Sequence, residues 1–151
     1  MAIQSLLVQA INLAEKAHAG QVDKCGNPYI EHPKRVMEMA DTTEKKIVSI
    51  LHDVVEDTDI SLETIERLFG EDIAEAVDAI SHRKNEPREE YYKRIMENGL
   101  AYSVKLLDLA DNTDPERMSK LDHETQSRLY KKYMKTYEIL TGSSDGQQPR
   151  F

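Results

Sequence analysis

The chain has 151 residues, of which 39% are hydrophobic and 32% charged, and a formal net charge of −8. This length suits one globular domain, and the negative charge argues against a nucleic-acid or anionic-membrane partner. No apolar run approaches the roughly 20 residues that a membrane span needs. The single cysteine, Cys25, excludes a disulfide framework. Because the N-terminal segment also lacks the features of a signal peptide, we expect a cytoplasmic protein.

Helical periodicity dominates the sequence: apolar residues recur three and four positions apart in successive segments, which Gly, Asn and Pro separate. In chain order, we expect a helix with its apolar face from Leu6 to Ala17, a second that begins at Pro33 with His32 as its cap, and a third that is capped by Asp41 and runs to about Glu56. Two shorter helices should follow, from Ser61 to Gly70 and over Ile73–Ile80. The last three are expected through Tyr91–Met96, over about 100–112, and from near Asp122 onward. The sequence predicts an all-α, single-domain bundle of about seven to eight helices over residues 1–140. Residues 141–151 form a polar segment that we expect to be disordered.

The segment ILHDVVEDTD, residues 50–59, combines an apolar pattern with ionisable side chains. On one continuous helix, at about 100° per residue, His52, Asp53, Glu56 and Asp57 share one face and the apolar residues occupy the other. An ordinary amphipathic helix whose polar face meets water would show the same pattern.

The segment AYSVKLLDLADN, residues 101–112, is apolar around nearly its whole circumference, yet it contains Asp108. A carboxylate is almost never fully buried unless it is paired or bound to a metal. Lys105 and Asn112 lie close to Asp108 on the helical wheel. Asp108 is therefore expected either in a buried ion pair with a lysine or arginine, or as a metal ligand.

His32 on its own is compatible with a helix cap or a packed core residue. Together with His52, Asp53 and Asp108, however, it completes a set of two imidazoles and two carboxylates from three helices. Such a set suits a divalent ion of intermediate hardness, such as Mn²⁺ or Fe²⁺, and it lacks the thiolates of most structural zinc sites.

Three segments resemble a known family: AHAGQVDKCGNPYIEHPKRV at 17–36, ILHDVVEDTDISLETIERLFG at 50–70 and VKLLDLADN at 104–112. The order His … His-Asp … Asp is similar to that of HD-superfamily metal-dependent phosphohydrolases. The surrounding residues resemble the hydrolase domain of RelA/SpoT proteins and the small alarmone hydrolases, including the metazoan SpoT homologue, over roughly residues 5–140.

The resemblance implies that His32, His52, Asp53 and Asp108 ligate one divalent ion, typically Mn²⁺, with Fe²⁺ or Mg²⁺ as alternatives. The implied reaction is release of the 3′-pyrophosphate from (p)ppGpp to give GDP or GTP. A metal lowers the pKa of bound water and screens the charge of a pyrophosphate, while a nearby carboxylate accepts the proton.

The resemblance also implies roles for residues around the metal. Glu56 and Asp57 match the acidic pair that activates and orients the attacking water. Lys24 and Asn112 match positions that contact the nucleotide, and Lys105 is a further candidate for a phosphate contact.

Three acidic residues depart from the family pattern: Asp23, Asp111 and Asp114. Negative charge close to an anionic nucleotide disfavours binding, so another substrate, such as ppApp or NADPH, remains an alternative. A non-catalytic module that binds and reports a nucleotide is the alternative from another class. The Glu56–Asp57 pair favours an enzyme, because a sensor has no need to activate water. The oligomeric state does not follow from the sequence.

Overall fold

The computed structural model describes residues 2–142, so the predicted disordered segment lies outside the described residues apart from its first two positions. The described part contains ten helices: α1 (Ile3–Ala17), α2 (Glu31–Met39), α3 (Thr43–Leu51), α4 (Val54–Asp57), α5 (Leu62–Phe69), α6 (Glu71–Ile80), α7 (Arg88–Met96), α8 (Gly99–Asn112), α9 (Pro115–Met118) and α10 (His123–Thr141). Two of them, α4 and α9, have only four residues each. Over residues 2–142 there is no β-strand, only an isolated bridge between Val22 and Pro28. The predicted all-α bundle is confirmed.

Polar side chains at the helix starts explain where several helices begin, because each accepts a hydrogen bond from a backbone N–H that the helix leaves unpaired. These capping residues are Thr42, Ser61, Asn98, Asp114 and Asp122. The expectation that Asp41 caps α3 is wrong. Its carboxylate lies outside the helix, 3.0 Å from the Lys45 Nζ, while Thr42 provides the cap.

Two helix boundaries near the polar residues differ from the expected ones. Helix α2 begins at Glu31, so His32 lies inside its first turn rather than at the cap. The single helix expected to run to about Glu56 is also wrong, since α3 ends at Leu51 and α4 begins at Val54. His52 and Asp53 form the turn between them, and the φ and ψ angles of both lie in the right-handed helical region.

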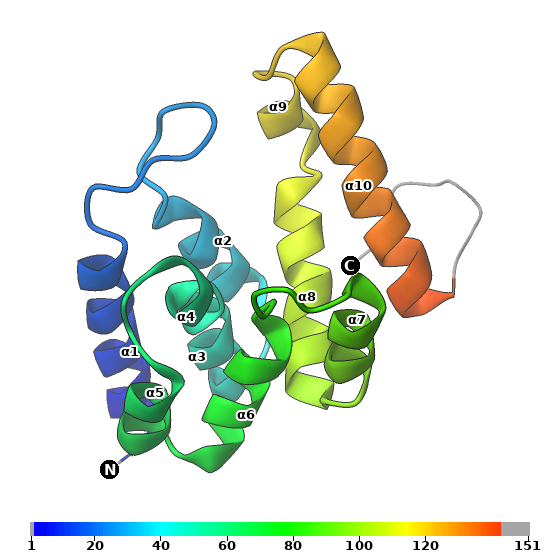
Figure 1. Ribbon diagram of the computed structural model, residues 1–151. Helices are drawn as coiled ribbons and strands as arrows, with labels where there is room; N and C mark the ends of the chain where they lie inside the picture. The colour runs from blue at the N-terminus through cyan, green and yellow to red at the C-terminus, as the bar shows by residue number, and fades with distance from the viewer. Residues whose placement is uncertain (1, 143–151) are drawn as a thin grey trace.

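The main core lies around α3, against which α1, α2, α6 and α8 pack (Figure 1). Ile47, Val48, Ile50 and Leu51 of α3 are fully buried there. Helix α8 in turn contacts α2, α3, α6, α7 and α10. Its other side contributes to a second apolar cluster, built on Tyr91, Tyr92, Ile95, Leu109 and Leu140. Helix α8 therefore joins the two halves of the bundle.

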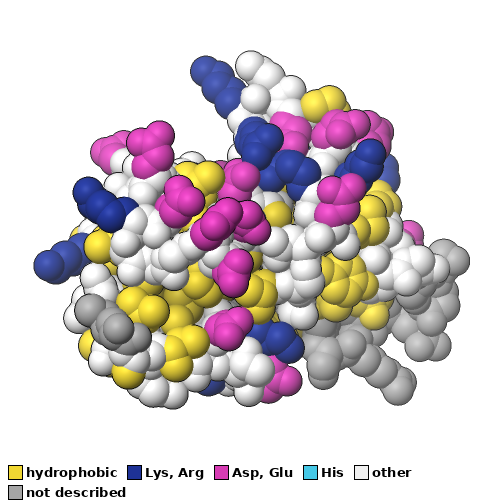
Figure 2. Space-filling view, turned by 90° about the horizontal axis from the view of Figure 1, so that it is seen from below, with side chains coloured by type: hydrophobic (Ala, Val, Ile, Leu, Met, Phe, Trp, Pro, Cys, Tyr) yellow, Lys and Arg dark blue, Asp and Glu magenta, His cyan; other side chains and the backbone are white. Residues whose placement is uncertain are grey.

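The surface carries the acidic character of the chain. Asp and Glu side chains are spread over the face that Figure 2 shows, in keeping with the net charge of −8. Among the described residues, no helix is both long and apolar enough to span a membrane.

Because Ile47 is completely buried in the core, the substitution Ile47→Ala should lower the free energy of unfolding by about 2–5 kcal/mol. Urea denaturation followed by circular dichroism measures this change. Val8, which is 59% exposed on α1, provides the control, and Val8→Ala should change the stability by less than about 0.5 kcal/mol. Equal effects of the two substitutions would contradict the assigned core.

Candidate functional site

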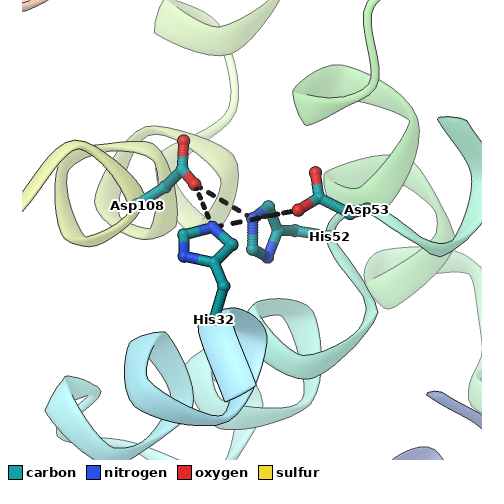
Figure 3. A group of neighbouring side chains, drawn as sticks. All are labelled: His32, His52, Asp53 and Asp108. Carbon is teal, nitrogen blue, oxygen red and sulfur yellow. Dashed lines mark hydrogen bonds and ion pairs between the residues drawn. The ribbon is translucent and has the colours of Figure 1, made fainter. Parts of the chain in front are cut away.

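Four side chains from four places in the fold converge on one point (Figure 3). His32 comes from α2, His52 follows α3, Asp53 precedes α4 and Asp108 comes from α8. The Asp108 Oδ1 lies 2.8 Å from the His32 Nε2 and 3.1 Å from the His52 Nε2. The Asp53 Oδ2 lies 3.0 Å from the His52 Nε2 and 3.9 Å from the His32 Nε2. One donor atom from each residue thus lies within 4.8 Å of the other three.

His52 and Asp53 occupy the turn between the end of α3 at Leu51 and the start of α4 at Val54, and from this turn both side chains reach the same point.

The hydrogen bonds of the two imidazoles fix which nitrogen faces the cluster. The His52 Nδ1 lies 2.6 Å from the Ser49 carbonyl oxygen, and the His32 Nδ1 lies 2.6 Å from the Asp111 Oδ2. Both partners can only accept, so each Nδ1 donates its proton outward. When either ring is neutral, its Nε2 therefore presents a lone pair to the cluster, as metal-ligating histidines do.

The protonation states of the two histidines and two aspartates in the cluster depend on one another. Burial disfavours the charged form of His32 and His52, but the carboxylates of Asp108, Asp111 and Asp53 outweigh it and raise the pKa of both rings. For Asp53, burial disfavours ionisation, yet the neighbouring His52 outweighs it and lowers the pKa to about 2. The pKa of Asp108 is also lowered, because Lys105 and the two imidazoles outweigh the effect of burial. Two ionised carboxylates therefore face the two imidazole Nε2 atoms, and either protons on these nitrogens or a metal cation must lie between the nitrogens and the carboxylates. The group can hold a divalent metal.

Two further side chains hold these carboxylates in place. The Tyr29 hydroxyl donates to the Asp53 Oδ2 at 2.5 Å. Burial and the nearby Asp53 raise the pKa of Tyr29, so the phenol keeps its proton. The Lys105 Nζ lies 3.0 Å from the Asp108 Oδ2. The sequence left Asp108 either in an ion pair or in a metal site, and the structure shows the ion pair with Lys105 within the same cluster as the two histidines.

Glu56 and Asp57 lie on α4 beside this cluster, and their carboxylates form a second acidic group with Asp53. Burial and the charges of Asp53 and Glu56 raise the pKa of Asp57 to about 6. The Glu56 Oε1 accepts a 2.6 Å hydrogen bond from the backbone N–H of His82.

The loop that carries His82 is fixed by Arg94 from α7. The Arg94 guanidinium donates to both carboxylate oxygens of Glu86 and to the carbonyl oxygens of Asp78 and Ser81, all at 2.7–2.8 Å. These bonds cross-link the loop between α6 and α7. The donor that holds Glu56 therefore comes from a cross-linked loop, which no motif of the sequence marks as part of the site.

A cavity of about 570 Å³ opens beside the cluster. The residues expected to contact a nucleotide all line it, namely Lys24, Lys105 and Asn112, together with Glu56 and Asp57. Lys132 and Tyr133 of α10 line it as well, although the sequence analysis had not linked them to the site.

The three acidic departures each have local partners. The Asp23 Oδ1 accepts hydrogen bonds from the backbone N–H groups of Cys25 and Asn27, at 2.9 Å each, and so shapes the loop that carries Lys24. Asp114 caps α9. Asp111 is buried, contacts His32 and pairs with two arginines. Of the three, only Asp23 lines the cavity.

Comparison with known proteins adds the family. A family model described as "HD domain" matches residues 10–147. The chain is 33% identical over 147 residues to the bifunctional (p)ppGpp synthase/hydrolase SpoT of Escherichia coli K12, an alignment that covers 89% of this chain and 21% of that protein. It is 32% identical over 117 residues to the guanosine-3′,5′-bis(diphosphate) 3′-pyrophosphohydrolase MESH1 of Danio rerio, covering 71% of this chain and 65% of that one. The chain thus spans about a fifth of the length of the Escherichia coli relative.

A solved structure shares the fold. It is described as a metazoan ortholog of SpoT that hydrolyses ppGpp, and it superposes with a TM-score of 0.74 and 24% sequence identity over 93% of this chain and 88% of that one. Because the family model matches most of the chain and the helices superpose over nearly all of it, this chain belongs to the HD domain family.

Proposed function

We propose that this protein is a divalent-metal-dependent pyrophosphohydrolase that removes the 3′-pyrophosphate of (p)ppGpp. The observation that carries the proposal is the cluster of His32, His52, Asp53 and Asp108 next to Glu56 and Asp57 in a cavity that also contains Lys24. The names of the Escherichia coli and Danio rerio relatives support the substrate. In this reaction a water oxygen bonds to phosphorus, the 3′ phosphoester bond breaks, and the products are pyrophosphate and GDP or GTP.

The ligands of the ion would be the His32 and His52 Nε2 atoms with one carboxylate oxygen each from Asp53 and Asp108. Two nitrogens and two oxygens without a thiolate suit Mn²⁺, with Fe²⁺ or Mg²⁺ as alternatives. A divalent ion at this point supplies Lewis acidity, which screens the charge of the pyrophosphate and favours deprotonation of water.

Glu56 and Asp57 would take the proton of the attacking water and orient it. The hydrogen bond from the His82 N–H holds one oxygen of Glu56. A base works best when its pKa is near the operating pH, and the pKa of about 6 for Asp57 brings it close to that range.

The cations of the cavity would bind the phosphates. Lys24 is exposed on the loop between α1 and α2, where it is free to meet a ligand. Lys105 and Asn112 also line the cavity, but each donates a hydrogen bond to Asp108. We therefore assign Lys24 to direct phosphate contact. Lys105 and Asn112 would share their donors between the substrate and Asp108.

Another nucleotide is an alternative substrate, because Asp23 places a carboxylate on the cavity wall beside Lys24. The ppApp and NADPH alternatives differ from (p)ppGpp in base or phosphate pattern, and product analysis distinguishes them. A non-catalytic sensor would bind nucleotide without turnover. We expect a small-molecule partner in the cytoplasm, where a free thiol such as that of Cys25 stays reduced.

Incubation of the protein and Mn²⁺ with ppGpp, ppApp, NADPH and GTP in parallel should release pyrophosphate and GDP from ppGpp. Excess EDTA should abolish the release, because the cluster needs its cation to act on the pyrophosphate. Chromatography of the nucleotides with a coupled pyrophosphate assay identifies the products. Inorganic phosphate from NADPH alone would refute the assigned substrate, and binding without any product would favour the sensor.

The substitutions His52→Ala and Glu56→Gln should separate metal binding from proton transfer. His52→Ala should lose the ion, because it removes one of four ligands. Glu56→Gln should keep the ion and lose about 10²–10⁴-fold in kcat, the usual contribution of a general base. Metal content by mass spectrometry and steady-state kinetics measure both effects.

Asp59 provides the control for this pair, since it is exposed two residues beyond Asp57 and does not line the cavity. Asp59→Asn should leave both the metal content and kcat unchanged. Full activity of Glu56→Gln would show that the acidic pair is not the base.

Lys24→Ala should raise the KM for ppGpp about 10–150-fold, since a hydrogen bond to a charged group contributes roughly 1.5–3 kcal/mol. It should leave the affinity for Mn²⁺ unchanged, because Lys24 does not contact the cluster. Lys34, a partly exposed lysine on α2 that pairs with Glu15 and does not line the cavity, is the control, and Lys34→Ala should have a normal KM. Equal KM values for Lys24→Ala and wild type would remove Lys24 from the phosphate site.

A further inference from the structure

Asp111 lies one helical turn after Asp108 on α8, and its side chain is 6% exposed. Its Oδ2 lies 2.6 Å from the His32 Nδ1 and 2.8 Å from the Arg117 Nη1, and its Oδ1 lies 2.8 Å from the Arg35 Nε. Arg117 also donates to the Asp111 backbone carbonyl oxygen at 2.7 Å. The Asp111 carboxylate therefore accepts from three side chains, two on α2 and one on α9.

Two pairs of residues with the same spacing connect α2 and α8, which lie side by side (Figure 1). His32 and Arg35 are three positions apart on α2, and Asp108 and Asp111 are three positions apart on α8. Residues three apart share a helix face. Helix α8 thereby contacts both nitrogens of the His32 ring, with Asp108 at Nε2 and Asp111 at Nδ1.

The two histidines differ in what orients them. The Nδ1 of His52 donates to Ser49, one turn earlier in the same segment, so its orientation needs no other helix. The Nδ1 of His32 depends on Asp111, which is 79 residues away in sequence. Arg35 and Arg117 pair with the same carboxylate and hold it against the ring.

We propose that Asp111, held by Arg35 and Arg117, is a positioning residue that fixes the tautomer and ring orientation of His32 as a metal ligand. A carboxylate that accepts from the outer nitrogen of a metal-ligating histidine orients the ring and raises its basicity toward the ion. This inference rests on the metal site of the proposed function and is independent of which nucleotide is hydrolysed. It also gives Asp111 a role other than the repulsion of an anionic substrate.

The test is the affinity for Mn²⁺ alone, measured by isothermal titration calorimetry on metal-free protein without nucleotide. Asp111→Ala should weaken Mn²⁺ binding about 10–100-fold, the usual effect of losing such a partner. Asp111→Asn keeps the size and one acceptor oxygen, so it should fold even where Asp111→Ala does not, and its loss should be smaller but measurable. At saturating Mn²⁺ both variants should recover kcat to within a few-fold of wild type.

Asp122→Ala is the control, because Asp122 is a helix-capping carboxylate that caps α10 through the Thr125 N–H and has no partner in common with Asp111. It should lower the melting temperature in EDTA but leave the dissociation constant for Mn²⁺ unchanged. If Asp111 has only a structural role, its variants should show the same pattern, with an altered melting temperature and an unaltered affinity for Mn²⁺. That result would overturn the proposal.

Failure of this inference can be distinguished from failure of the proposed function. If wild type binds Mn²⁺ and Asp111→Ala binds it weakly, but wild type does not cleave ppGpp, the positioning role stands and the substrate assignment fails. Wild-type cleavage of ppGpp together with unaltered Mn²⁺ affinity in both Asp111 variants would refute the positioning role alone.

Discussion

A buried carboxylate needs positive charge close by, and the arrangement of this site follows from that requirement at Asp108. Its oxygens contact the imidazoles of His32 and His52, the Lys105 ammonium and the Asn112 amide. Moving an ionised carboxylate out of water without such partners would cost several kcal/mol or more. Asp108 therefore ties α2, the end of α3 and α8 to one point. A divalent ion there would replace protons that the two imidazoles otherwise have to carry.

The turn between α3 and α4 carries two of the residues that meet at this point. The apolar residues of α3 lie in the core, so this helix is fixed in position. His52 and Asp53 follow it and face one cluster, and α4 then places Glu56 and Asp57 at the cavity wall. The hydrogen bond from His82 and the Arg94 contacts hold that wall from the other side. The metal cluster and the acidic pair are thus fixed by different parts of the fold, which is why we expect their substitutions to separate ion binding from turnover.

Much of the fold and part of the candidate site could be predicted from the sequence, for physical reasons that are specific to each residue. The 3.6-residue periodicity indicated an all-α bundle, and an isolated aspartate in the apolar segment 101–112 marked Asp108 as unusual. The break between α3 and α4 was not predicted, because the residues on both sides of it continue the same helical pattern. The expected Asp41 cap was wrong because Thr42, one residue later, provides the oxygen instead. Asp111 was interpreted as a charge near the substrate, since its arginine partners come from positions 35 and 117. Only the folded chain brings those residues together.

Anomalous diffraction from crystals grown with Mn²⁺, recorded at the manganese edge, would show whether His32, His52, Asp53 and Asp108 bind one divalent ion. We expect a single strong peak within coordination distance of both Nε2 atoms and of one oxygen each from Asp53 and Asp108. A peak on the neighbouring group of Asp53, Glu56 and Asp57 alone, or no peak at either group, would contradict this expectation.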